Sequence, residues 1–215
     1  TINNPINTAG ITSVTLGTSN FVAGVNAGNS IVSGGNYNTV VGDEAGTAIT
    51  TGDNNVAVGY SALVANTTGN HNTASGFSAL GANTTGLNNT AVGRIALAAN
   101  TTASNNTAVG SSSLYSNTTG ANNTAVGLSA LEANTTGLHN NALGKGALQS
   151  NTTAANNVAI GYESLKANTT GTSNNAVGNA SLEANTTGNY NTAVGHASLY
   201  ANTTGSNNTA FGRSA

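Results

Sequence analysis

Several residue types are missing or scarce in this sequence, and each absence excludes a class of protein. There is no cysteine, which excludes disulfide bonds and thiolate metal sites. There is no tryptophan and aromatic residues make up only 4%, so a globular core built on bulky side chains is not expected. No apolar run reaches the ~18 residues of a membrane-spanning helix.

Charge is equally scarce. Charged residues make up 5% of the sequence, compared with about 25% in an ordinary globular protein, and the formal net charge is −2. The four basic residues are dispersed along the chain and form no patch for a phosphate backbone or an anionic membrane. Nucleic acid and membrane insertion are therefore not expected for this stretch.

A strict repeat takes the place of these missing features. Glycines recur every 17 residues without insertion or deletion, at Gly42, Gly59, Gly76, Gly93, Gly110, Gly127, Gly144, Gly161, Gly178, Gly195 and Gly212. A leucine follows four positions later in nine units, from Leu63 to Leu199, and an Asn-Thr-Thr triplet follows seven positions later. A period this regular predicts a one-dimensional array in which each unit packs on its neighbours.

Each unit is too short for a helix and favours strands. The segment Asn-Thr-Ala-Val-Gly contains a β-branched residue and is bounded by Asn and Gly. Ser-Ala-Leu-x-Ala is more ambiguous, but the turn residues leave no room for a helix of about ten residues. We therefore predict an all-β parallel β-roll or β-solenoid of 17-residue turns, with two strands of about five residues per turn.

The repeat divides the chain into two parts. Residues 1–34 contain shorter relatives of the strand motif at other spacings, and they are predicted to form an irregular cap or the end of another module. Residues 35–215 are predicted to form the 17-residue-repeat solenoid. The N-terminus resembles no signal peptide and has no initiator methionine, so we expect a removed leader or a piece of a longer chain.

Comparison of the units with one another predicts which residues face inward. The position before the glycine is almost always large and apolar, as in Val58, Val92 and Ile160, and is predicted to lie inside the coil. From the unit of Gly59 onward the alternate position is alanine, with an asparagine two residues earlier. We predict that this small-residue edge is covered by other copies of the chain, as a homo-oligomer interface. Its alanines are Ala57, Ala74, Ala91, Ala108, Ala125, Ala142, Ala159, Ala176, Ala193 and Ala210.

The motif Asn-Thr-Ala-Val-Gly-x-x-Ala-Leu-x-x-Asn-Thr-Thr-Gly resembles repeats of phage and virus tail-fibre proteins over roughly residues 35–215. It also resembles the head repeats of trimeric autotransporter adhesins, which are shorter. The resemblance implies a left-handed parallel β-roll of three chains wound side by side. It also implies an extracellular location, on a virion or a cell surface, and a role in attachment.

No catalytic, metal or cofactor site is expected. His71 and His139 share one column but lie four turns apart, about 19 Å at the stacking distance of strands, which is too far to share a metal. His196 belongs to another column. Asp43, Glu44 and Asp53 form the one local acidic group, for which a solvated or capping role is favoured over cation binding. The chain is therefore not expected to be an enzyme.

The Asn-Thr-Thr triplets are also formal N-glycosylation sequons. Two interpretations remain open for them: turn ladders formed by the asparagines, or a row of glycans along one edge. The asparagines concerned are Asn66, Asn83, Asn100, Asn117, Asn134, Asn151, Asn168, Asn185 and Asn202. Further sequons begin at Asn88, Asn105, Asn122 and Asn207.

One outward stripe is chemically varied. It carries Tyr60, Phe77, Tyr115, Tyr162 and Tyr200, interleaved with charged residues. Because aromatic rings stack on sugars and on other rings, this stripe is a candidate contact for a cell-surface carbohydrate or receptor. A solvated face is an equally good interpretation.

The sequence thus favours a structural rod of an extracellular fibre, homotrimeric and adhesive. The alternative is a self-assembling extracellular filament whose protomers stack end to end. A fibre-borne enzyme lacks a site in this stretch.

Overall fold

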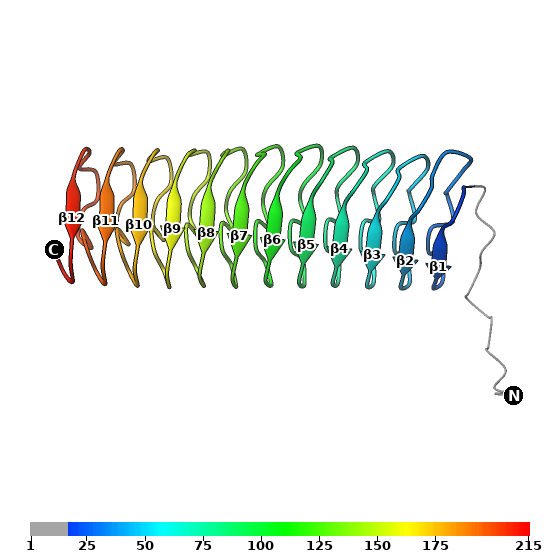
Figure 1. Ribbon diagram of the computed structural model, residues 1–215, viewed down its shortest axis with the longest axis horizontal. Helices are drawn as coiled ribbons and strands as arrows, with labels where there is room; N and C mark the ends of the chain where they lie inside the picture. The colour runs from blue at the N-terminus through cyan, green and yellow to red at the C-terminus, as the bar shows by residue number, and fades with distance from the viewer. Residues whose placement is uncertain (1–16) are drawn as a thin grey trace, which may run out of the picture.

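The computed structural model describes residues 17–215, which form a single parallel sheet of twelve short strands and contain no helix. Figure 1 shows the strands side by side along the long axis, each followed by a loop that returns to the start of the next strand. The strands are β1 (Phe21–Ala23), β2 (Thr39–Val41), β3 (Val56–Val58), β4 (Thr73–Ser75), β5 (Thr90–Val92), β6 (Thr107–Val109), β7 (Thr124–Val126), β8 (Asn141–Leu143), β9 (Val158–Ile160), β10 (Asn175–Val177), β11 (Thr192–Val194) and β12 (Thr209–Phe211).

Sheet order follows sequence order from β1 to β12, and every pair is parallel. From β2 onward the partner of each residue lies one repeat away, as for Ala108 and Ala125 or Ala125 and Ala142. The strict period therefore sets the register, and the prediction of an all-β solenoid with 17-residue turns is confirmed. No helix that could cross a membrane occurs among the described residues.

The sheet begins inside the segment that was predicted to be an irregular cap. β1 pairs with β2, with Phe21 opposite Thr39, a separation of 18 residues. The extra residue lies in the connecting loop, so the strand joins the stack although it is out of step with the later repeat. The related motif at Val14, Thr15 and Leu16 lies outside the described residues.

Each turn contains one strand of three residues, and the prediction of two five-residue strands per turn is wrong. The backbone of the Ser-Ala-Leu segment is left-handed at two positions, with φ of 55° at Ser129 and 52° at Leu131. A third left-handed residue, His139 with φ of 56°, precedes the next strand. An extended strand cannot include left-handed residues, so this side of the coil is a series of tight turns.

The inside and the outside of the strand are the reverse of the prediction. Ala125 of β7 is fully buried, whereas Val58 and Val92 are 38% and 39% exposed. The same holds for the other alanines predicted to form an oligomer interface: Ala57, Ala74, Ala91, Ala108, Ala142, Ala159, Ala176 and Ala193 lie in the core, and Ala210 of the last strand is partly buried. The chain itself covers these alanines, so they are not accessible to a second copy.

The core of each turn is thin and consists of one large side chain with small neighbours. Leu131 is fully buried, together with Ala125 and Ala130, and the same three positions are filled in the neighbouring turns. Burying one leucine contributes roughly 1.5–3 kcal/mol. Alanine lies inside because the strand wall and the turn wall leave room for only one large residue between them.

The first two turns fill this space differently. Gly46 occupies the leucine position with φ of 54°, and the fully buried Ile49 occupies the place of the later Asn66. A side chain on Gly46 would meet Ile49 Cδ1 at 2.8 Å. Gly28 and Ile31 repeat the arrangement one turn earlier. The large core residue has therefore moved three positions along the chain, and the glycine makes room for it.

The glycine that marks the repeat ends each strand in a conformation that other residues rarely adopt. Gly127 has φ of 137°, and a Cβ there would lie 2.5 Å from the carbonyl oxygen of Gly144 in the next turn. This double requirement of conformation and space explains why glycine recurs at this position without exception.

Two leucines of one turn provide a matched test of this core. We expect Leu131→Ala to lower the free energy of unfolding by about 2–5 kcal/mol, because it leaves a cavity in a one-leucine core. Leu128, which is 48% exposed, should tolerate alanine within about 0.5 kcal/mol. Denaturant unfolding followed by circular dichroism measures both values. Equal effects of the two substitutions would contradict the assignment of the core.

Candidate functional site

The interior contains two columns of buried asparagines, and the first column begins each strand. The backbone N–H of Asn123 donates to Asn106 Oδ1 at 2.9 Å, and Asn123 Oδ1 accepts from the N–H of Asn140 at 2.9 Å. Asn123 Nδ2 donates to the carbonyl of Gly137 at 2.8 Å. Asn123 therefore links three successive turns, and it lies on the same inward face as Ala125.

The second column consists of the asparagines of the Asn-Thr-Thr triplets. Asn134 Nδ2 donates to Asn117 Oδ1 at 2.8 Å and to Gly137 O at 3.1 Å. The carbonyl of Gly137 thus accepts one amide from each column and joins them. No buried side-chain nitrogen or oxygen of the described residues lacks a hydrogen-bond partner.

This geometry favours the ladder interpretation of the triplets over the glycan interpretation. Eight of the nine triplet asparagines are fully buried, and Asn202 of the last turn is half-buried. Their side-chain nitrogens point into the coil, where a glycan has no room. The asparagines of the sequons at Asn88, Asn105, Asn122 and Asn207 are exposed.

Adjacent asparagines allow the ladder to be tested with one kind of substitution. Asn123→Gly should lower the free energy of unfolding by about 2–3 kcal/mol, because the N–H of Asn140 loses its buried acceptor. Asn122→Gly should change it by less than about 0.5 kcal/mol, because Asn122 is exposed and its φ of 59° suits glycine. The two values come from denaturant titration. A larger loss at Asn122 would refute a structural role for the column.

The predicted aromatic stripe is partly assembled. Tyr60 and Phe77, in adjacent turns, stack with ring centroids 5.6 Å apart and ring planes 18° apart. The Arg94 guanidinium lies over the Phe77 ring at 6.0 Å from its centroid. Tyr115 and Tyr200 belong to a different outward column, and are exposed there. The stripe is therefore two parallel columns, and only the first has aromatic rings in contact.

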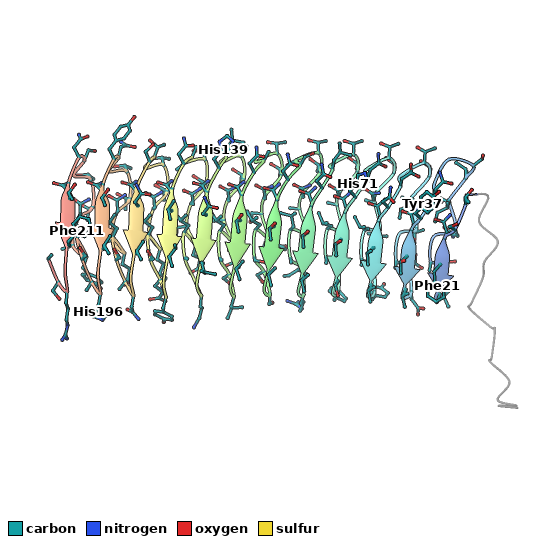
Figure 2. The ribbon with its side chains drawn as sticks, in the orientation of Figure 1. Phe21, Tyr37, His71, His139, His196 and Phe211 are labelled. Carbon is teal, nitrogen blue, oxygen red and sulfur yellow. The ribbon has the colours of Figure 1, made fainter. Side chains whose placement is uncertain are left out.

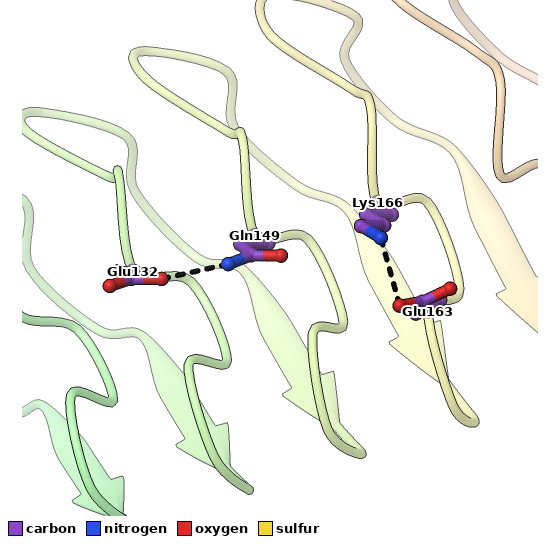
Figure 3. A network of polar contacts seen from close by, with 4 residues as sticks. All are labelled: Glu132, Gln149, Glu163 and Lys166. Atoms are coloured by element: carbon purple, nitrogen blue, oxygen red, sulfur yellow. Dashed lines mark hydrogen bonds and ion pairs between the residues drawn. The ribbon is translucent and has the colours of Figure 1, made fainter.

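Tyr162 lies farther along the first column, within a group of charged residues. The Lys145 ammonium lies 5.5 Å from the centroid of the Tyr162 ring, and Lys166 Nζ pairs with Glu163 Oε1 at 2.8 Å. The hydrogen bond from Lys166 lowers the pKa of Glu163 and raises that of Lys166. A hydrogen bond with Glu163 raises the pKa of the Tyr162 phenol. In Figure 3 the pair Lys166–Glu163 lies one turn beyond a second contact, from Gln149 Nε2 to Glu132 Oε2 at 2.8 Å.

The lowered pKa of Glu163 predicts a specific titration. Its ion pair is formed above the ordinary glutamate pKa and is lost as the pH falls through the lowered value. Lys166→Gln should move the Glu163 midpoint up toward the ordinary range. Lys145→Gln should move it less, since Lys145 contributes only through a weaker charge interaction. Carboxyl carbon chemical shifts followed by NMR from pH 2 to 7 measure the three midpoints. An unchanged midpoint in Lys166→Gln would contradict the pairing.

The three histidines stay apart from one another, as their spacing in the repeat requires. Figure 2 shows His71 and His139 along one long edge with Tyr37, and His196 along the opposite edge. No group of three or more histidine, aspartate or glutamate side chains suited to a metal occurs among residues 17–215. Asp43 and Glu44 accept hydrogen bonds from Val25 and Asn26 of the preceding turn, and Asp53 accepts from Asn36. These carboxylates therefore serve as connections between turns.

A surface that the sequence prediction missed is the outer face of the sheet. It consists of the first and third residues of every strand, and we call it the strand face. From β2 to β12 the first residue is threonine in seven strands, and the third residue is Val, Ile, Leu, Phe or Ser. Many of these side chains are partly exposed, among them Val109 at 36% and Ile160 at 39%. The alternation in Thr-Ala-Val indicated that the strand has two faces. The prediction placed valine inside and alanine outside, and the structure shows the reverse.

Comparisons with family models, curated proteins and solved structures find no match to this chain.

Proposed function

We propose that this chain is a structural rod of an extracellular fibre, such as a segment of a tail fibre or a surface adhesin that mediates attachment. The observation that supports the proposal best is the unbroken sheet from β1 to β12, in which every strand pairs only with its sequence neighbours. Eleven steps of ~4.7–4.8 Å give a rod of about 50 Å. Repetition of one unit adds length and adds no enclosed site.

The hydrogen-bond pattern also supports a mechanical role. Backbone bonds join each turn to the next at several points around the coil, for instance Thr124 N to Asn140 O and Thr135 N to Thr152 O. The two asparagine columns add further links in the interior. At each contact between turns, several of these bonds share a force applied along the rod axis. This suits a part that holds an attachment surface away from its base.

The aromatic column is the proposed contact for a cell-surface carbohydrate or receptor. Tyr60, Phe77 and Arg94 present a neighbouring ring pair and a cation on the outside of three adjacent turns. Aromatic faces and edges with an adjacent cation suit the apolar and polar sides of a sugar. This is the part of the rod surface with the most varied chemistry.

A deletion series tests the rod. Removing residues 107–157, which are three whole units, should shorten the particle by about 14 Å in small-angle X-ray scattering and leave a folded chain. Removing residues 107–156 takes out one residue fewer and leaves an extra residue directly before a strand, so this variant should unfold at a lower denaturant concentration than the whole-unit deletion. A particle length that does not follow the number of units would overturn the rod. A length that grows with protein concentration would instead support the end-to-end filament.

The cellular role needs a second experiment. Antibodies against residues 35–215 should label fibres on intact virions or cells of the source without permeabilisation. Labelling that appears only after permeabilisation would exclude an extracellular fibre.

A further inference from the structure

We infer that the strand face is an interface between copies of this chain. The inference gives the proposed rod its partner, but it rests on separate observations. Homo-oligomerisation was expected through the alanine column, which the structure places in the core. The question is therefore which outer surface, if any, has the properties of a contact between chains.

The first observation is the distribution of charge. All ten charged residues of the sequence lie within the described turns, and none of them occupies the first or third position of a strand. They lie on the loop columns instead, for example Lys145 just after the β8 glycine and Glu163 just after Tyr162. Twelve strands thus provide 24 outward positions without one charge. At the 5% charge of the whole sequence, 24 positions would carry about one charge, so the absence agrees with a covered face but does not by itself require one.

The second observation is the apolar content of the face. The third residues of the strands form a column of valine, isoleucine, leucine and phenylalanine, interrupted by Ser75 and, in β1, by Ala23. Exposure reaches 49% at Leu143. Monomeric soluble proteins rarely expose continuous apolar patches of more than a few hundred Å². β-Branched side chains at regular spacing are those that pack sheet against sheet.

The third observation is that the repeat matches itself. A second copy has the same spacing of ~4.7–4.8 Å, so once one pair of strands meets, every other pair meets at an equivalent place. The face measures about 50 Å by about 10 Å, so a pair of such faces covers about 1,000 Å² in total, about the smallest area expected of a biological interface. A partner with any other repeat would lose this agreement after a few strands.

The test uses charge on the strand face and a matched control. In the Val92→Lys, Val177→Lys double variant, two lysines lie five turns apart on the face. In the Leu128→Lys, Asn179→Lys variant, two lysines lie at exposed positions of the loop column that already holds Arg94 and Lys145. Light scattering across a concentration series should give an oligomer for the wild-type chain and the control. Self-association of the face variant should be at least about tenfold weaker, because the interface would bury unpaired charges.

A labelling experiment covers the case in which the face variant does not fold. The natural chain has no cysteine, so Val109→Cys and Leu128→Cys each introduce a single thiol. Above the association concentration, a maleimide probe should react with the Val109→Cys thiol at least about tenfold more slowly than after dilution. The Leu128→Cys thiol should react at the same rate in both conditions.

Each outcome separates this inference from the proposed function. A dimer or a trimer with Val109→Cys protected supports it. A wild-type chain that stays monomeric, or an oligomer in which Val109→Cys reacts freely, overturns it and leaves the rod standing. Failure of the deletion series to change particle length overturns the rod without deciding the interface.

Discussion

The structure depends on one carbonyl group in each regular turn. Gly137 O accepts an amide from Asn123 and another from Asn134, and so joins the two asparagine columns. Unpaired amides inside a protein cost about 1–3 kcal/mol each, so both columns require this acceptor. The coil therefore keeps a fixed cross-section, and each turn must repeat its neighbours' geometry to remain satisfied.

This constraint explains both the strict period and the composition. Insertion of one residue between Asn123 and Ala125 would turn one of these two side chains out of the core, whereas the extra residue between β1 and β2 is absorbed in a loop. In the regular turns the one large apolar side chain lies where Leu131 does, and alanine, serine and the two asparagines fill the other inner positions. Bulk and charge are confined to the outside. The scarcity of aromatic residues thus follows from the thin core of the coil, which has little space for large side chains.

The architecture could be predicted from the sequence, but which side chains of each strand face the core could not. Spacing predicts an array of stacked units, and a 17-residue unit with two turn motifs is too short for a pair of helices, so a β-solenoid follows. The side on which Ala125 lies was not predictable, since alanine and valine are both apolar and periodicity does not distinguish inside from outside. The deciding residue is Asn123, whose amide finds partners only within the coil. A buried asparagine is not expected from sequence alone, because its hydrogen-bond acceptor, here the carbonyl of Gly137, is known only from the structure. Left-handed leucines such as Leu131 are similarly unforeseeable, because no propensity favours them.

The exchange of leucine and asparagine for Gly46 and Ile49 has a consequence for how such a chain changes in evolution. From Asn66 onward the units carry equivalent core residues at equivalent positions. Unequal recombination can therefore add or remove whole units there without creating a mismatched contact between turns. The turn that carries Gly46 and Ile49 differs from the later units at two core positions, so it cannot be exchanged for one of them without changing the core.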